Sequence, residues 1–171
     1  METENNDVTI SCLQHAITDA QETIRAYDSK AEILAILLTV ALGITNFTLL
    51  QNNPDAWSRY LLAVSWIVGL LTLASLGMVL RPRKNPFKGI LLGAYRPAGT
   101  YFFCNVLACP ENTVEGLAKR AKDTDWVSEL TYESVKLSLI REAKHGWFSR
   151  ALWFAALTLL LVTLAVLKVV A

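Results

Sequence analysis

The sequence predicts an all-α integral membrane protein with three transmembrane helices and a cytosolic helical region. Of its 171 residues, 53% are hydrophobic, and the mean hydropathy is +0.36, more apolar than a typical soluble domain. The apolar residues gather in runs, and three runs reach the roughly 20 residues that a helix needs to cross a bilayer. Two or four spans are the alternatives.

The first segment, residues 1–30, is predicted to be a cytosolic amphipathic helix. Residues 1–9 are polar, and we expect them to be frayed. From residue 10, apolar positions recur at alternating intervals of three and four, which is typical of one helix face. The members of this stripe are Ile10, Leu13, Ile17, Ala20, Ile24, Tyr27, Ala31 and Leu34. One interpretation is that the stripe packs on the chain's own cytosolic domain. The other is that it forms a self-association seam between copies. The short length of the stripe and its two alanines favour the first interpretation.

Residues 31–80 are predicted to form a transmembrane hairpin. The first span runs from about Ala31 to Leu50. The segment QNNPDAWSR at 51–59 is a short turn, because Asn-Pro breaks a helix and polar residues surround it. The second span runs from about Tyr60 to Leu80. So short a connection makes the two spans antiparallel neighbours.

Residues 81–150 are predicted to be a cytosolic helical region and the candidate ligand sensor. The stretch 90–109 is fairly apolar, but Gly93, Arg96 and Pro97 interrupt it. We interpret it as membrane-proximal or folded cytosolic structure. A fourth or re-entrant span is the alternative, disfavoured because an arginine at the bilayer centre costs roughly 2.5–3.5 kcal/mol.

Two polar helices are expected next, at about Thr113 to Lys122 and Asp125 to Lys144, with Gly146 as a joint before the membrane. The third span, from about Arg150 to Leu167, lies in the last segment, 151–171. Its final lysine, Lys168, is expected to snorkel to the opposite interface.

The basic residues set the predicted orientation. In the three-span arrangement fourteen of the sixteen lysines and arginines fall on one side, with only Arg59 and Lys168 on the other. Positive charge marks the cytosolic face. We therefore expect a multi-pass protein with a cytosolic N-terminus and, in a bacterial inner membrane, a periplasmic C-terminus. No cleaved signal peptide is expected, because the first residues lack a basic region followed by an apolar one.

No motif in the sequence points to catalysis, so we expect no enzyme. HExxH, GxSxG, P-loop and GxGxxG patterns are absent. The three cysteines, Cys12, Cys104 and Cys109, fit neither a disulfide framework nor a standard zinc spacing. We therefore expect no metal or cofactor. The net charge of +1 gives no reason to expect nucleic acid as a partner, and spans without an internal carboxylate, histidine or arginine argue against an ion pump.

Lys144 stands out among the basic residues. It falls on the apolar side of its helix, together with Leu130, Leu137, Ile140 and Trp147. Snorkelling is one interpretation. The other is a salt bridge to Asp28, which should lie at the same membrane depth.

Several short segments resemble one known family. Asp28-Ser29-Lys30-Ala31, followed at once by an aliphatic span, is similar to the D-x-K-A motif of the Pycsar effector transmembrane family, PycTM. Tyr101-Phe102-Phe103 resembles the family's aromatic segment. The stretch Leu130 to Ile140 with Lys144 resembles its last cytosolic helix. The resemblance covers about Leu13 to Leu167. Departures are His145, where the family often has an aromatic residue, and Cys104, near which it often has a glycine.

The resemblance implies an effector of a bacterial antiphage system. A partner cyclase would make a cyclic pyrimidine nucleotide, cCMP or cUMP, on infection. The effector would then impair the inner membrane, and the cell would die before phage matures. The lipid bilayer and this nucleotide are the implied partners, and we expect a homo-oligomer. The alternative function is a non-gated anchor or scaffold that recruits a cytosolic partner through the Ile10 to Tyr27 stripe.

Three sets of candidate residues follow from this implied function. A cyclic nucleotide calls for cations at its phosphate and an aromatic at its base; the candidates are Arg81, Arg83, Lys84, Tyr95, Arg96 and Lys144. The motif and gating candidates are Asp28, Lys30, Ala31 and Lys144. The candidate pore-lining residues are Thr39, Asn46 and Thr48, or Thr72 and Ser75.

Overall fold

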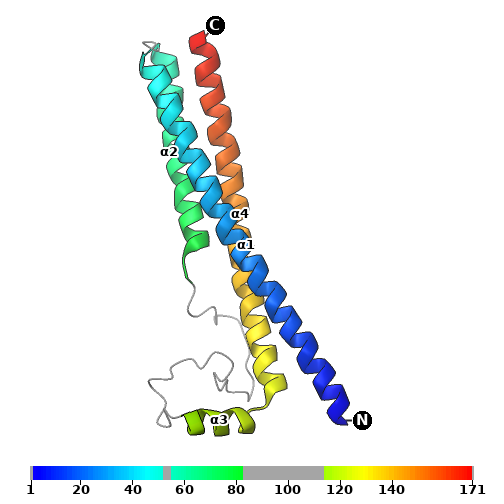
Figure 1. Cartoon of the computed structure of the whole chain (residues 1–171). Coiled ribbons are helices and arrows are strands. Elements are labelled where there is room, and N and C mark those ends of the chain that lie inside the picture. Colours follow the sequence, from blue (N-terminus) through cyan, green and yellow to red (C-terminus); the bar gives the residue numbers. More distant parts are fainter. Residues whose placement is uncertain (1, 52–54, 83–113, 171) are drawn as a thin grey trace. The chain divides into compact units, whose positions relative to one another are not determined.

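The computed structural model describes the backbone of residues 2–51, 55–82 and 114–170, and the side chains of residues 6–47, 55–82 and 114–168. The described chain is all-α, as predicted, with four helices and no strand: α1 (Glu2–Gln51), α2 (Ala56–Leu80), α3 (Val114–Asp123) and α4 (Trp126–Val170) (Figure 1). Three of them, α1, α2 and α4, are long and apolar enough to cross a membrane. The stretch 90–109, and with it the question of a fourth span, lies outside the described residues.

Two of the helices are longer than the sequence predicted. Helix α1 begins at Glu2, so the segment expected to be frayed is helical. Helix α4 runs through Gly146, so the predicted joint there is wrong. A glycine inside a helix costs only about 1 kcal/mol relative to alanine. A Cβ added at Gly146 would meet nothing within 4 Å, so no neighbour demands a break.

The chain divides into two compact units, and α1 and α4 contribute residues to each. The membrane bundle consists of Ile24–Pro82 and Glu142–Ala171. The polar unit consists of Met1–Thr23 and Arg83–Arg141. Each long helix therefore continues without interruption from one unit into the other.

The membrane bundle packs α1, α2 and the second half of α4 around small side chains. One core cluster joins Ala31, Leu76, Val79 and Ala151, and a second joins Leu38, Leu42 and Val162. Small residues let transmembrane helices approach closely, which compensates for the weak hydrophobic drive between helices in lipid.

Gly69 marks a close approach of α2 to both of its neighbours. A Cβ added there would lie 2.7 Å from Cδ1 of Leu42 on α1 and 3.7 Å from Cγ2 of Thr158 on α4. Only glycine fits this position without moving the buried Leu42 side chain.

Most of the buried hydroxyl groups described in the bundle are hydrogen-bonded within their own helices, the exception being Ser58 Oγ. Thr72 donates to Val68 O at 2.9 Å, and Ser75 donates to Leu71 O at 2.8 Å. Thr158 on α4 donates to Phe154 O at 2.8 Å. These bonds satisfy polar groups that would otherwise be costly in an apolar interior.

In the polar unit, the chain itself covers the apolar stripe of α1. Ile17 and Ala20 are buried, and Ile10 and Leu13 are half-buried, whereas most of the residues between them are exposed. Leu130 and Tyr132 of α4 are also buried. This stripe therefore supplies core packing within a single chain.

Candidate functional site

The predicted pairing of Lys144 with Asp28 is present in the structure. The Lys144 ammonium on α4 donates a hydrogen bond to the Asp28 carboxylate on α1 and forms an ion pair with it. The Lys144 side chain is only 6% exposed, while Asp28 is 34% exposed. A buried ammonium needs such a partner, since an unpaired charge in an apolar environment costs several kcal/mol, of order 3–5 when one partner of a buried pair is removed.

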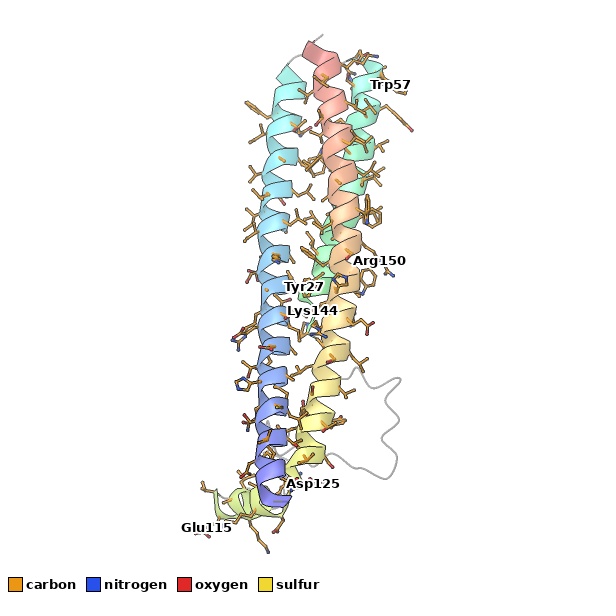
Figure 2. All side chains as sticks on the ribbon, turned by 90° about the vertical axis from the view of Figure 1, so that its right-hand side faces the viewer. Tyr27, Trp57, Glu115, Asp125, Lys144 and Arg150 are labelled. Atoms are coloured by element: carbon orange, nitrogen blue, oxygen red, sulfur yellow. The ribbon has the colours of Figure 1, made fainter. Side chains whose placement is uncertain are left out.

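The ion pair has aromatic neighbours from the same two helices. Tyr27 Oη and His145 Nδ1 form a hydrogen bond of 2.9 Å. The Tyr27 ring also packs against Phe148 at a centroid distance of 5.6 Å. Figure 2 shows Tyr27 and Lys144 at the same level of the membrane bundle. Tyr27, the residue directly before Asp28, thus adds a second contact between α1 and α4.

The other motif residues have different environments. Ala31 is fully buried in the core cluster with Val79 and Ala151, so its small side chain brings the three helices together. Lys30 is exposed and forms no ion pair with another described residue. Its position favours contact with solvent or lipid headgroups.

The structure tests few of the nucleotide-binding candidates. Arg81 is the C-cap of α2, is exposed, and donates its backbone N–H to Gly77 O at 3.0 Å. Lys144 is buried and engaged with Asp28, so an incoming phosphate would have to displace that carboxylate. The remaining candidates lie outside the described residues; they are Arg83, Lys84, Tyr95 and Arg96.

The pore-lining candidates divide between two sides of the membrane bundle. Thr39 is exposed on the outside, where its hydroxyl donates to Ala35 O at 2.8 Å. Asn46 is half-buried, and the side chain of Thr48 lies outside the described residues. Thr72 and Ser75 instead face the packed interior. A channel lined by Thr39 would therefore need several copies of the chain.

Sequence reasoning missed a second charged residue in the apolar face of α4. Glu133 is buried and pairs with Lys136 at 3.0 Å, and its neighbour Glu129 is buried too. Glu133 lies three residues after Leu130 and four before Leu137, so the spacing that singled out Lys144 also applies to Glu133. The signal is weak, because the segment around Glu133 is polar as a whole.

The opposite end of the membrane bundle has an exposed charge cluster. Lys168 lies 3.7 Å from the Asp55 carboxylate and 5.8 Å from the centre of the Trp57 ring. Hydrogen bonding to Ser58 and, more weakly, the charge of Lys168 lower the pKa of the Asp55 carboxyl. The lysine expected only to snorkel thus has a protein partner on α2.

At the start of α4, Asp125 caps the helix. Ser128 donates its hydroxyl to Asp125 Oδ2 at 2.5 Å and its backbone N–H to Oδ1 at 3.4 Å. The hydroxyl bond, followed by the backbone bond, holds the pKa of the Asp125 carboxyl below its usual value of 3.8. A charged carboxylate here also interacts favourably with the helix dipole.

Together these features define an all-α multi-pass membrane protein whose first and last helices are joined by an ion pair near one end of the bundle. The family model PycTM, described as the Pycsar effector protein domain, matches residues 12–171. The chain belongs to this family, which supports a role as an antiphage effector. The comparisons with curated proteins and with solved structures gave no match.

Proposed function

We propose that this protein is activated by a cyclic pyrimidine nucleotide, cCMP or cUMP, made by a partner cyclase on infection, and that it then impairs the bacterial inner membrane. Abortive infection follows from the loss of membrane integrity. The protein catalyses no reaction in this proposal and uses no cofactor. Its N-terminus is cytosolic and its C-terminus periplasmic, in accordance with the distribution of positive charge.

The ion pair between Lys144 and Asp28 supports this proposal most directly. It joins α1 to α4, the two helices that continue from the membrane bundle into the polar unit. A change in the polar unit can therefore reach the bundle along continuous helices. The pair is the proposed gating contact, because it links a charged side chain of α1 to an oppositely charged side chain of α4.

Nucleotide binding must favour the membrane-impairing state over the resting one, since only differential affinity shifts an equilibrium. The phosphodiester carries one negative charge, which suits arginine or lysine side chains. In this proposal the basic residues that follow α2, beginning with the exposed Arg81, supply the cations.

Dye entry into living cells tests the proposal. Cells that express this chain are supplied with cCMP or cUMP by a co-expressed cyclase, and a membrane-impermeant dye is added. We expect dye entry and growth arrest only when the cyclase is active; a catalytically dead cyclase is the control. Intact membranes and normal growth in the presence of either nucleotide would refute the proposal.

The anchor or scaffold alternative is less well supported. It requires the Ile10 to Tyr27 stripe to be available to a partner. Ile17 and Ala20 at the centre of that stripe are buried within the single chain, and no other observation favours recruitment through it.

A further inference from the structure

The outward side of α1 in the membrane bundle carries a second, different stripe. Ile36, Thr39, Gly43 and Asn46 recur at intervals of three and four, so they share one helix face. The first three are exposed and Asn46 is half-buried. We name these four residues the outer α1 face. The exposed residues beside it are large and apolar, for example Leu37, Val40 and Ile44, as expected of a surface that meets lipid.

Helix α1 is the least covered of the three spans. In its most apolar stretch 22% of the residues are buried, against 33% for α2 and 28% for α4. Much of its surface is therefore left for contacts outside the single bundle.

Gly43 is not required by close packing against the part of the chain that the structure describes. A Cβ added there would meet nothing within 4 Å, whereas one added at Gly69 would collide with Leu42 at 2.7 Å. Packing within the chain thus explains why a glycine is needed at position 69, but it does not explain the glycine at position 43. Thr39 and Gly43, four residues apart, form the small-xxx-small spacing that brings two transmembrane helices into close contact.

Asn46 indicates what the outer α1 face contacts. Its amide group forms no hydrogen bond with another residue of the described chain. A polar group in a transmembrane helix is costly without a partner. The amide carries both donors and an acceptor, so the same residue of a second copy satisfies it. A symmetric assembly places like residues against one another in this way.

We propose that the outer α1 face is the surface through which copies of this chain associate side by side in the bilayer. The copies are parallel, because every chain inserts with the same orientation. This inference goes beyond the proposed function, since it requires neither a nucleotide nor membrane damage.

Cysteine cross-linking in native membranes tests the proposed surface. The variants are made in a background in which Cys12, Cys104 and Cys109 are replaced by serine. Thr39→Cys and Asn46→Cys are each oxidised with copper phenanthroline, and the control is Leu157→Cys on the exposed side of α4. We expect covalent dimers for the two α1 variants and none for the control. No dimer at either position, or equal dimer at Leu157, would overturn the proposal.

Two glycine substitutions provide a matched pair. Gly43→Leu and Gly77→Leu both add a side chain at an exposed helix position where a Cβ meets nothing within 4 Å, so we expect both variants to keep the single bundle. In the Thr39→Cys background, Gly43→Leu should lower the cross-linked fraction about fivefold or more by blocking close approach, and Gly77→Leu should not. An unchanged fraction with Gly43→Leu would exclude the outer α1 face as the contact.

The cross-linking is carried out with and without the active cyclase. A dimer in either condition supports the surface, and its absence in both refutes it. If Thr39→Cys forms dimers while the nucleotide admits no dye, the association surface stands and the proposed function fails. The two ideas are therefore separable in one set of cells.

Discussion

Lys144 on α4 forms an ion pair with Asp28 on α1, with the lysine almost fully buried and the aspartate partly open to its surroundings. Because of this difference in exposure, the charge of Lys144 depends on the ion pair more than the charge of Asp28 does. Lys144 has little access to water if the pair is lost, whereas Asp28 can be solvated.

Reversal of one charge should therefore break the α1–α4 contact, and reversal of both should restore it. Lys144→Glu places two carboxylates together, and we expect a loss of about 3 kcal/mol, the low end for buried pairs because Asp28 is a third exposed. Thermal unfolding in detergent measures the stability, and dye entry measures signalling, which Lys144→Glu should abolish.

The double variant Lys144→Glu with Asp28→Lys should recover part of both properties. As a control, Lys168→Glu disrupts the exposed pair with Asp55 and should change the stability far less, because solvent-exposed ion pairs contribute little. Failure of the double variant to recover would remove the pair from the gating proposal.

A methyl group at Gly69 should be harmful, whereas the same change at Gly77 should be neutral or favourable. Gly69→Ala forces the buried Leu42 side chain to move, and overpacking costs about 1–3 kcal/mol. Gly77→Ala adds a methyl in open space and gains up to about 1 kcal/mol of helix propensity. The melting temperatures of the two variants in the same detergent check this; equal values would show that α2 does not pack closely on α1 at Gly69.

Loss of the Tyr27 hydroxyl should matter less than loss of its ring. Tyr27→Phe removes the bond to His145, which lies at an exposed position, and should cost about 0.5–1 kcal/mol. Tyr27→Ala also removes the contact with Phe148 and the core cluster and should cost about 2–3 kcal/mol. Chemical unfolding followed by tryptophan fluorescence distinguishes them, and a Phe variant as unstable as the Ala variant would contradict the packing argument.

Acidification should loosen the first turn of α4 through Asp125. Its pKa is lowered in the folded protein by hydrogen bonds from Ser128. The stabilisation is therefore present above the unfolded pKa, near 3.8, and is lost as the pH falls through the lower folded value. Asp125→Ala should cost about 1 kcal/mol of local stability at neutral pH.

Hydrogen exchange of the first-turn amides measures this effect. Asp125→Asn keeps a capping side chain without a charge, so its exchange should not follow the same pH dependence. If the wild type and Asp125→Asn respond alike as the pH falls from about 5 through the lowered pKa of Asp125, the carboxylate is not the titrating group.

The residues whose burial the sequence predicts correctly share one spacing pattern. Apolar positions at intervals of three and four identified the covered side of α1, including Ile17 and Ala20. The same spacing put Lys144 among apolar neighbours, where a buried cation requires an anion, and Asp28 was at the matching depth. Periodicity is informative here because a long helix repeats its environment many times.

Features that depend on a particular neighbour could not be predicted in this way. Whether Gly146 breaks α4 depends on its neighbours, and among the described residues none lies within 4 Å of a Cβ placed there. Whether Lys168 snorkels or pairs depends on how near α2 places Asp55. The spacing of residues along one helix does not give the distance to a side chain on a neighbouring helix.

Two of the ion-paired lysines of α4, those that bond to another part of the bundle, fix its depth in the bilayer. Lys144 and Lys168 are 24 positions apart, which in an α-helix corresponds to about 36 Å, slightly more than the roughly 30 Å of a hydrocarbon core. Each pair joins α4 to a different helix, one at either end. A shift of the bundle by a single turn would draw one charged pair into hydrocarbon, so its depth in the membrane is set from both sides, and a thicker bilayer would have to thin around it.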